Sequence, residues 1–300
     1  MKKSRFTLKM WLSLLLIAVL FVLLLWWLNS GKQAAPQQWQ ALVCDLGQGS
    51  GTLLRTGEHR AILVDTGPEN SDLGACLDWA GIHTLEGILL SHDHADHTGN
   101  LELALTYLEP AGQAQIFCPA QMGSDCGLSK QELGERSAQP LEQGQIITST
   151  GIRIESLWPT DQDSYPGIDF ENKNNTSLIL LCTLKGDSEQ EDLTVLLPGD
   201  AEQLALETAL KQKAGGDKIK IDALVVPHHG SKTSGSSYLN LLSTPLALIS
   251  AGKNNPYGHP HTQVVRQLQE HGIRVVSTLD QGHCALYRQE YSLHMLTQKQ

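Results

Sequence analysis

The chain has 300 residues, of which 41% are hydrophobic and 18% charged, and its formal net charge is −10. This is the composition of an ordinary globular protein with room for one large α/β domain or two smaller ones, and it excludes a low-complexity or repetitive chain. The first 32 residues hold five of the 22 basic residues and no acidic one, so the remainder carries 17 basic against 32 acidic residues, formally −15. A surface of that sign argues against tight, non-specific binding of nucleic acid, but not against a site where a phosphate meets a metal ion.

The first predicted element is a membrane-spanning helix. Residues 11–28 read WLSLLLIAVLFVLLLWWL and carry no charge. At 1.5 Å of rise per residue they would cover about 27 Å, close to the thickness of a bilayer core. Basic residues between positions 2 and 9 precede the segment and predict a cytoplasmic N-terminus. The alternative is a cleaved signal peptide, with a weak small-residue cleavage site near Ala34.

We therefore expect three parts along the chain. Residues 1–32 form a basic tip and a single-pass signal anchor, residues 33–39 a linker, and residues 40–300 an extracytoplasmic domain. The membrane is thus an expected partner, and the domain would be secreted if the anchor is cleaved.

Beyond the linker, short apolar runs typical of strands alternate with amphipathic stretches. Strands are expected in QALVCDL, GTLLRT, RAILVDTG and LEGILLSH, and helices at about 72–81, 201–213, 236–242 and 261–271. All-apolar strands separated by helices predict an α/β fold with sheets covered by helices.

Five of the six cysteines fall into two groups. Cys118 and Cys126 lie in an irregular segment and could close a short disulfide loop in an oxidising compartment. Cys44, Cys182 and Cys284 lie in apolar strand-like runs, and we expect them to be small core residues.

The segment SHDHADHTGN at 91–100 crowds three histidines and two aspartates into seven positions directly after an apolar strand. Imidazole and carboxylate groups gather in this way most often around a metal ion. His92 and His94 alternate, so only a tight turn brings both side chains to one side. Asp96 and His97 are adjacent and can reach a second ion. The alternative is a set of solvated polar residues that cap the following helix.

Three further polar clusters adjoin apolar strands: NKNNTS before LILLCTL, PGD after LTVLL, and PHHGSKTS after IDALVV. Chemistry in α/β folds collects where strands end in loops, so these clusters are expected to meet the histidine loop.

The order and the residues of these motifs resemble those of the metallo-β-lactamase superfamily, with HxHxDH after a strand, DTG upstream, and GD and then HG downstream. The segments DLGQGSGTLL, NNTSLIL and LISAGKNNPYGHP are similar to the hydrolase domain of ComEC-type DNA-uptake proteins over about residues 40–287. The resemblance implies a four-layer αβ/βα sandwich, here preceded by one transmembrane helix.

The resemblance also implies a ligand set. His92 and His94 would hold a first metal ion, Asp96 and His97 a second, and Asp200 would bridge both. Hydrolysis would then proceed through a hydroxide that bridges the two ions, with Asp96 or Asp200 orienting it.

The remaining ligands follow from the downstream motifs. His229 precedes a glycine, as the final ligand does in the superfamily, and would complete the second site, while His228 would lie behind a ligand or face the substrate. Asn175 stands where the third ligand of the first ion is usually a histidine. We expect two divalent ions, zinc first and manganese as the alternative, because an amide oxygen is a hard ligand.

Four residues are expected around the ligands. Asp65 in VDTG would orient a ligand histidine or bind backbone at the strand end. Ser231 and Thr233 would line the pocket or cap the helix that follows, and His259 resembles a position at the pocket rim.

Two features depart from the ComEC-type pattern. That pattern usually has Asp where this chain has His94, and GQGD where it has Ser50. Its full-length members also carry a channel of many spans, whereas this chain has one predicted span at most.

We therefore expect a metal-dependent hydrolase that cleaves phosphodiesters, with single-stranded DNA as the first candidate substrate. The acidic surface opposes this substrate unless lysines form a local basic rim, and the candidates are Lys211, Lys213, Lys218, Lys220, Lys232 and Lys253. One alternative is a lactone, thioester or lactam hydrolase, and another is a catalytically silent binding module on the membrane face.

Overall fold

The computed structural model describes residues 8–30, 35, 38–110, 115–134, 136–160 and 162–299, without the side chains of residues 8–9, 23–30, 132 and 162. The chain divides into two compact units, Met1–Ala34 and Ala35–Gln300, and each is described by itself. Most of the predicted linker at 33–39 lies outside the described residues.

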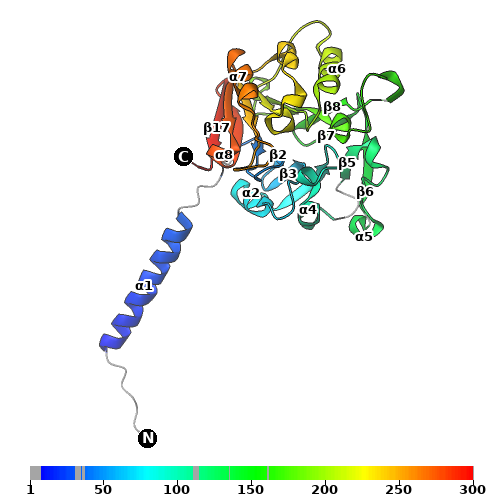
Figure 1. Cartoon of the computed structure of the whole chain (residues 1–300). Helices are drawn as coiled ribbons and strands as arrows, with labels where there is room; N and C mark the ends of the chain where they lie inside the picture. The colour runs from blue at the N-terminus through cyan, green and yellow to red at the C-terminus, as the bar shows by residue number, and fades with distance from the viewer. Residues whose placement is uncertain are drawn as a thin grey trace. The chain divides into compact units, whose positions relative to one another are not determined.

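The first unit contains helix α1, which runs from Leu8 to Ser30 (Figure 1). In the described part of the chain, no helix is both long and apolar enough to cross a membrane. The N-terminal transmembrane helix expected at 11–28 is therefore not supported. The side chains of 23–28 lie outside the described residues.

The second unit contains two large sheets. Among the described residues, the first sheet has eight strands in the order β17 (Ser292–Thr297), β16 (Cys284–Gln289), β1 (Ala41–Val43), β2 (Thr52–Gly57), β3 (Arg60–Val64), β4 (Thr84–Leu89), β5 (Gln115–Pro119) and β6 (Ser137–Leu141). The second has seven in the order β15 (Arg274–Ser277), β14 (Leu246–Ile249), β12 (Ala223–Val225), β10 (Leu193–Leu197), β9 (Ile179–Leu184), β8 (Ile152–Trp158) and β7 (Ile146–Ser149). A short parallel pair, β11 (Ile219–Lys220) and β13 (Leu242–Ser243), lies apart from them.

Each sheet combines a parallel and an antiparallel half. Strands β3, β4, β5 and β6 are parallel in the first sheet, and β10, β12, β14 and β15 are parallel in the second. The other neighbouring pairs in both sheets are antiparallel. The ends of the parallel strands are the positions where α/β folds place their sites.

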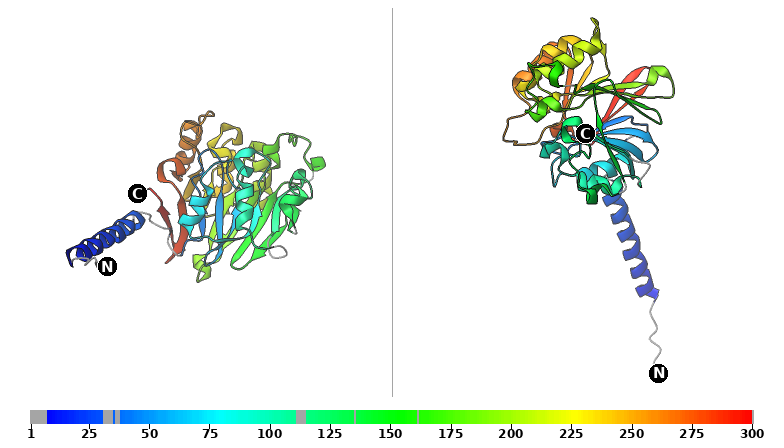
Figure 2. Two further views of the ribbon diagram at one scale, coloured as in Figure 1. Left: turned by 90° about the horizontal axis from the view of Figure 1, so that it is seen from below. Right: turned by 90° about the vertical axis from the view of Figure 1, so that its right-hand side faces the viewer.

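Helices cover the outer face of each sheet (Figures 1 and 2). The described α-helices of this unit are α2 (Leu73–Ala80), α3 (Ala95–Thr98), α4 (Leu101–Tyr107), α5 (Lys130–Leu133), α6 (Gln203–Ala214), α7 (Thr262–Glu270) and α8 (Thr278–Gln281). One core, which includes Leu77, lies between α2, α4 and the first sheet, and another, which includes Leu206, lies between α6, α7 and the second. A third core, which includes Val195, lies between the two sheets. The four-layer αβ/βα prediction is therefore confirmed.

Helix α2 shows how the sequence builds one of these layers. Its buried residues, Leu73, Cys76, Leu77 and Ala80, recur at helical spacing and form one apolar stripe against the first sheet. Burial of each leucine contributes roughly 1.5–3 kcal/mol. The helix ends at Gly81, whose φ of 70° lies in the left-handed region that favours glycine.

Three details differ from the sequence expectations. The segment expected as a helix at 236–242 forms a shorter 3₁₀ helix at Ser237–Leu241, because serine, tyrosine and asparagine favour the α-helix weakly. Strand β6 has no apolar alternation that would reveal it in the sequence. Cys44 is not a free core thiol, because it forms a disulfide with Cys76 of α2.

The other cysteine predictions are confirmed. Cys118 and Cys126 form a disulfide that closes a short loop, and Cys182 and Cys284 are free and buried.

Candidate metal centre

The predicted ligands come together at one edge of the two sheets. The histidine loop follows β4 of the first sheet, and Asp200 follows β10 of the second. His228 and His229 follow β12, which is parallel to β10, so both strands end at the same edge. The site is therefore assembled from both halves of the sandwich.

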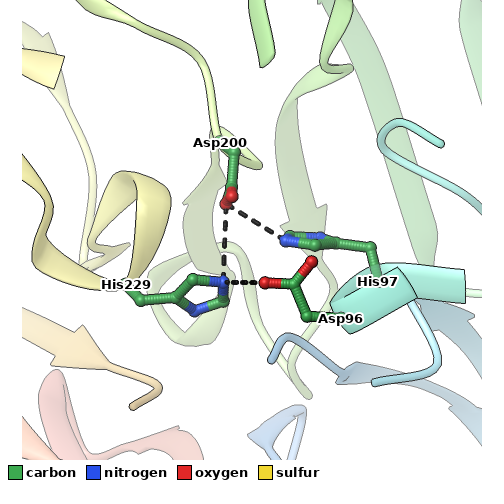
Figure 3. A group of neighbouring side chains, drawn as sticks. All are labelled: Asp96, His97, Asp200 and His229. Carbon is green, nitrogen blue, oxygen red and sulfur yellow. Dashed lines mark ion pairs between the residues drawn. The ribbon is translucent and has the colours of Figure 1, made fainter. Parts of the chain in front are cut away.

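Four of these residues form a compact group, which we call the inner group: Asp96, His97, Asp200 and His229 (Figure 3). One ligand atom from each lies within 4.8 Å of the others. Asp200 Oδ1 lies 3.1 Å from His97 Nε2 and 3.7 Å from His229 Nε2, and Asp96 Oδ2 lies 3.4 Å from His229 Nε2. Among the described residues this is the group whose donors could hold a metal ion.

The donor atoms of the inner group fit a divalent cation. His97 Nε2, His229 Nε2 and Asp200 Oδ1 are buried and have no hydrogen-bond partner among the described residues. Buried polar atoms are rarely left unpaired, so three around one point indicate a ligand that the chain itself does not provide. Two imidazole nitrogens and two carboxylates suit zinc and also manganese.

The other ring nitrogens of both histidines are fixed from behind. His97 Nδ1 lies 2.8 Å from Asp65 Oδ2, and His229 Nδ1 donates to the carbonyl oxygen of Ser250 at 2.9 Å. A donor bond at Nδ1 leaves the lone pair of Nε2 free for a metal. Asp65 thus lies where the sequence places a residue that orients a ligand histidine.

Electrostatics keep the inner carboxylates ionised. Burial alone would raise the pKa of Asp200, but the charges of His97 and His229 outweigh it and hold this pKa well below its usual value. Burial likewise opposes a low pKa at Asp96, yet its contact with His229 and the charges of His97 and His229 lower this pKa to about 2. Burial disfavours the charged form of His97, but the carboxylates of Asp200 and Asp65 raise its pKa well above the ordinary value.

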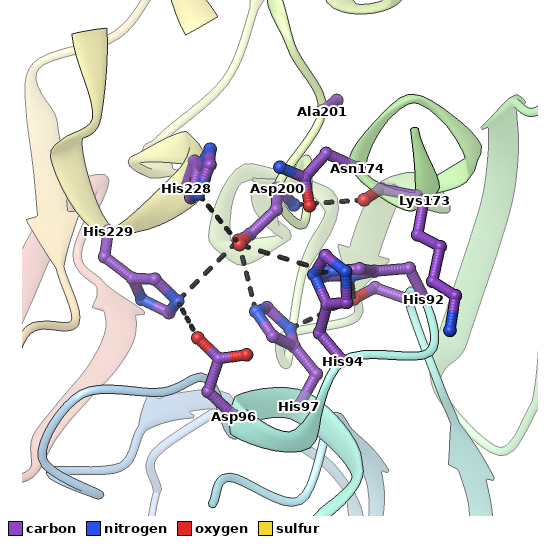
Figure 4. Close-up of polar contacts among 12 residues, drawn as sticks. His92, His94, Asp96, His97, Lys173, Asn174, Asp200, Ala201, His228 and His229 are labelled. Atoms are coloured by element: carbon purple, nitrogen blue, oxygen red, sulfur yellow. Dashed lines mark hydrogen bonds and ion pairs between the residues drawn. The ribbon is translucent and has the colours of Figure 1, made fainter. Parts of the chain in front are cut away.

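The expected first-metal ligands, which we call the outer pair, are His92 and His94. His92 is buried, and its Nε2 lies 3.0 Å from His94 Nδ1 and 3.9 Å from Asp200 Oδ2. The two rings thus contact each other beside the carboxylate (Figure 4).

Asn175, the expected third ligand of the first ion, is buried near this edge. Its Nδ2 donates to the carbonyl of Asp169 at 2.9 Å, and its backbone carbonyl accepts from Trp158 Nε1. The Oδ1 atom has no partner among the described residues. Its role as a ligand stays a prediction.

The segment Pro227–Gly230 presents two imidazoles in succession. His228 and His229 have φ values of 51° and 54°, in the left-handed region that non-glycine residues occupy at a cost of about 1 kcal/mol each. His229 reaches Asp200 Oδ1, whereas His228 Nε2 lies 3.5 Å from Asp200 Oδ2. Contacts from four histidines therefore meet at the Asp200 carboxylate (Figure 4).

The expected pocket residues lie around His228. Thr233 Oγ1 is 3.0 Å from His228 Nδ1 and 3.1 Å from Ser231 Oγ, so the hydroxyls support this imidazole. Ser231 Oγ also accepts from the backbone N–H of Thr233, which is the capping alternative. The His259 ring lies 5.6 Å from that of His228 between centroids.

Sequence reasoning missed several supporting groups. The Ser91 hydroxyl donates to Asp65 Oδ2 and lies 3.1 Å from His92 Nδ1, so one serine links the supporting carboxylate to a ligand. Its position directly before His92 was the available signal. Ser250 acts through its backbone carbonyl, which any residue carries, so the sequence holds no signal for it.

The first hairpin approaches the site closely at Gly49. A Cβ atom there would lie 2.5 Å from the backbone oxygen of Asp96 and 2.4 Å from Pro68 Cδ, so only glycine fits. The Ser250 hydroxyl donates to the Gly49 carbonyl at 2.6 Å and connects this turn to the second sheet.

The fold is that of the metallo-β-lactamase superfamily. The profile described as β-lactamase superfamily domain matches residues 60–183. Igni18, a metallo hydrolase from the archaeon Ignicoccus hospitalis, superposes with a TM-score of 0.53 at 14% identity, covering 86% of this chain and 99% of that one. The second unit therefore has the metallo-β-lactamase fold, and its residues 60–183 are similar to the β-lactamase superfamily domain.

Two curated relatives narrow the relationship. ComE operon protein 3 of Bacillus subtilis is 30% identical over 268 residues, which cover 81% of this chain and 32% of that protein. Competence protein ComA of Neisseria gonorrhoeae is 28% identical over 254 residues, 82% of this chain and 32% of that protein. The chain spans about a third of the length of these relatives. It resembles the ComEC-type domain of competence proteins.

Proposed function

We propose that the chain is a metal-dependent hydrolase that cleaves phosphodiesters, with single-stranded DNA as its first candidate substrate. The observation that carries the proposal is the inner group, where three buried donor atoms without partners surround one point at the edge of both sheets. The relationship to competence proteins favours a nucleic acid as the source of the phosphodiester.

In this proposal Asp96, His97, Asp200 and His229 hold one divalent ion, and the outer pair with Asp200 holds a second. Two such ions, when bound, lower the pKa of a water molecule and neutralise negative charge on a phosphoryl group.

The chain's own groups position the reactants. The carboxylates of Asp96 and Asp200 accept hydrogen bonds from the attacking water and fix its direction. His228 Nε2 faces the same space, its side chain is 20% exposed, and Thr233 holds the opposite ring nitrogen, so it can hydrogen-bond the leaving oxygen. The bond from the water oxygen to phosphorus forms, the ester P–O bond breaks, and one proton of the water ends on the released alcohol.

The test is cleavage of end-labelled single-stranded DNA by the purified 300-residue chain loaded with zinc or manganese. We expect cleavage that is lost with a chelator and in the Asp200→Asn variant. A chain that binds metal stoichiometrically and leaves DNA and small phosphodiesters intact would contradict the proposal and favour lactones or thioesters.

We further propose that the domain works outside the cytoplasm. Two disulfides, Cys44–Cys76 and Cys118–Cys126, support this location because such bonds persist mainly in oxidising compartments. Thiol labelling of the chain in intact cells tests it: these four cysteines should resist alkylation until a reductant is added. Immediate labelling of all four would contradict the location.

A further inference from the structure

An aromatic ladder leads from the inner group to the surface. The His259 ring is stacked on the His229 ring, with centroids 6.5 Å apart and an angle of 26° between the planes. The Tyr257 ring is stacked on the same His259 ring, with centroids 5.6 Å apart and again an angle of 26°. Three nearly parallel rings thus connect a buried ligand histidine to a tyrosine that is 64% exposed. Offset stacking at such spacings is a favourable arrangement of aromatic rings.

The loop that carries the ladder is held in shape before any ligand arrives. Asn255 Oδ1 accepts from the backbone N–H groups of Tyr257 and His259, and its Nδ2 donates to the carbonyls of Gly252 and His259. Gln48 of the first hairpin accepts from the Gly252 N–H and contacts His259 Nδ1. One asparagine therefore fixes the loop at both ends, so little ordering would be needed when a ligand stacks on it.

Lysines without a carboxylate partner lie on the same loops. Lys253 is in the Tyr257 loop and Lys232 follows His229 by three residues, and neither pairs with a carboxylate among the described residues. Other lysines of the predicted basic rim are already engaged, since Lys211 pairs with Glu207 and Lys213 with Glu155. Lys253 and Lys232 lie on the loops that carry the ladder rings, and no carboxylate among the described residues engages them.

We infer that Tyr257, supported by His259, is a stacking platform for a base of single-stranded nucleic acid whose phosphodiester lies at the metal centre. This inference rests on the proposed function and specifies its substrate. An exposed aromatic ring, on loops that also carry unpaired lysines, is a combination that binds single strands without reading their sequence, because every base has a flat face. It also supplies local attraction on a domain whose overall charge is strongly negative.

Binding and cleavage are measured separately to test the platform. A fluorescent phosphorothioate oligonucleotide, which resists cleavage, is titrated into the metal-loaded chain and its anisotropy recorded. We expect Tyr257→Ala to weaken binding about tenfold, within the range for loss of one base stack, and Tyr257→Phe to retain it. Tyr291→Ala is the matched control, because Tyr291 is 74% exposed and lies in the turn between β16 and β17.

An abasic oligonucleotide supplies the second arm. If a base occupies the platform, oligonucleotides with consecutive abasic positions bind the wild type as weakly as Tyr257→Ala binds the intact strand. The inference would be overturned if Tyr257→Ala and the wild type bound the intact strand with equal affinity. It would also be overturned if Tyr257→Ala lowered the affinity for the intact strand and for the abasic strand by the same factor.

The two proposals fail in different ways. If binding depends on Tyr257 but natural DNA is not cleaved, the stacking platform is supported and the proposed hydrolase function is contradicted. If DNA is cleaved and Tyr257→Ala does not change the KM, the hydrolase function is supported and the stacking platform is contradicted.

Discussion

The inner group and the outer pair meet at one carboxylate but differ in how far they are prepared for a metal. In the inner group both histidines are held from behind, by Asp65 and by the Ser250 carbonyl, and their Nε2 atoms face a common point without partners. In the outer pair His92 Nε2 lies 3.0 Å from His94 Nδ1, a spacing that one ion could bridge, but the other ring nitrogen of His94 has no partner among the described residues, so this ring has to be ordered when an ion binds.

This difference indicates an order of binding. A preformed site retains its ion, whereas a site that needs rearrangement binds more weakly. We therefore expect the first ion to occupy the inner group tightly and a second to bind the outer pair with lower affinity. The predictions below test this order.

The largest effect is expected from Asp200→Asn, because Asp200 contacts both parts of the centre through its two oxygens. Neutralising a buried ligand shared by both ions should remove tight metal retention altogether and lower the cleavage rate by roughly a thousandfold or more. Elemental analysis after gel filtration and single-turnover cleavage measure the two effects. Retention of a full equivalent of metal would show that Asp200 is not a ligand.

Asp65→Asn should act mainly on the inner group, because Asp65 contacts His97 directly and His92 only through the Ser91 hydroxyl. Asparagine tolerates the φ of 60° at this position and keeps an oxygen for the Ser91 backbone N–H, but it removes the negative charge beside His97. Loss of such a supporting carboxylate lowers metal affinity by about 10–100-fold.

Competition with a chromophoric chelator measures this affinity, and His94→Ala is the comparison variant. It should weaken only the second, looser binding event. The order of binding is wrong if Asp65→Asn weakens only the looser event and His94→Ala only the tighter one.

Thr233→Val should lower kcat moderately, because it acts on His228 and not on the ligands of the inner group. The substitution keeps the shape of the side chain but removes the hydroxyl next to His228 Nδ1. A single hydrogen bond contributes about 1 kcal/mol, so we expect roughly a fivefold lower kcat with unchanged metal content. Thr106→Val is the control, since the Thr106 hydroxyl bonds only its own helix. A change in metal content would place His228 among the ligands.

The smallest effect is expected at the Lys173–Asp93 ion pair, which joins the histidine loop to the segment before β9 at 2.6 Å. Both side chains are more than half exposed, and such pairs contribute at most about 1 kcal/mol. Lys173→Ala should therefore change KM and the unfolding temperature only slightly at moderate salt. A large change would mean that this pair holds the loop carrying His92 and His94 in place.

Much of the centre could be predicted because its side chains carry their own signal. Four polar clusters adjoin apolar strands, and parallel strand ends meet at one edge, so the PGD and PHHG clusters could be placed beside the histidine loop. The choice of Asp200 and His229 as ligands followed from the resemblance. The α/β class could be predicted from the sequence because its apolar strand-like runs alternate with helical segments.

What could not be predicted rests on backbone atoms or on distant pairing. The Ser250 carbonyl that fixes His229, and the left-handed turn at Pro227–Gly230, leave no mark in residue type. The Cys44–Cys76 disulfide joins a strand end to a helix 32 residues away, and sequence spacing does not determine such pairing. The stacked face of Tyr257 depends on the fold of an irregular loop for the same reason.

The two left-handed histidines in succession also bear on how this centre could change during evolution. His228 and His229 point to different oxygens of Asp200 only because both adopt φ near 50° before Gly230. Deleting one residue from this turn would leave a single imidazole, which could contact either the buried Oδ1 side of Asp200 or the Oδ2 side that His228 now faces, but not both. In a set of descendants, the length of the turn should therefore be under stronger selection than the identity of the residues around it.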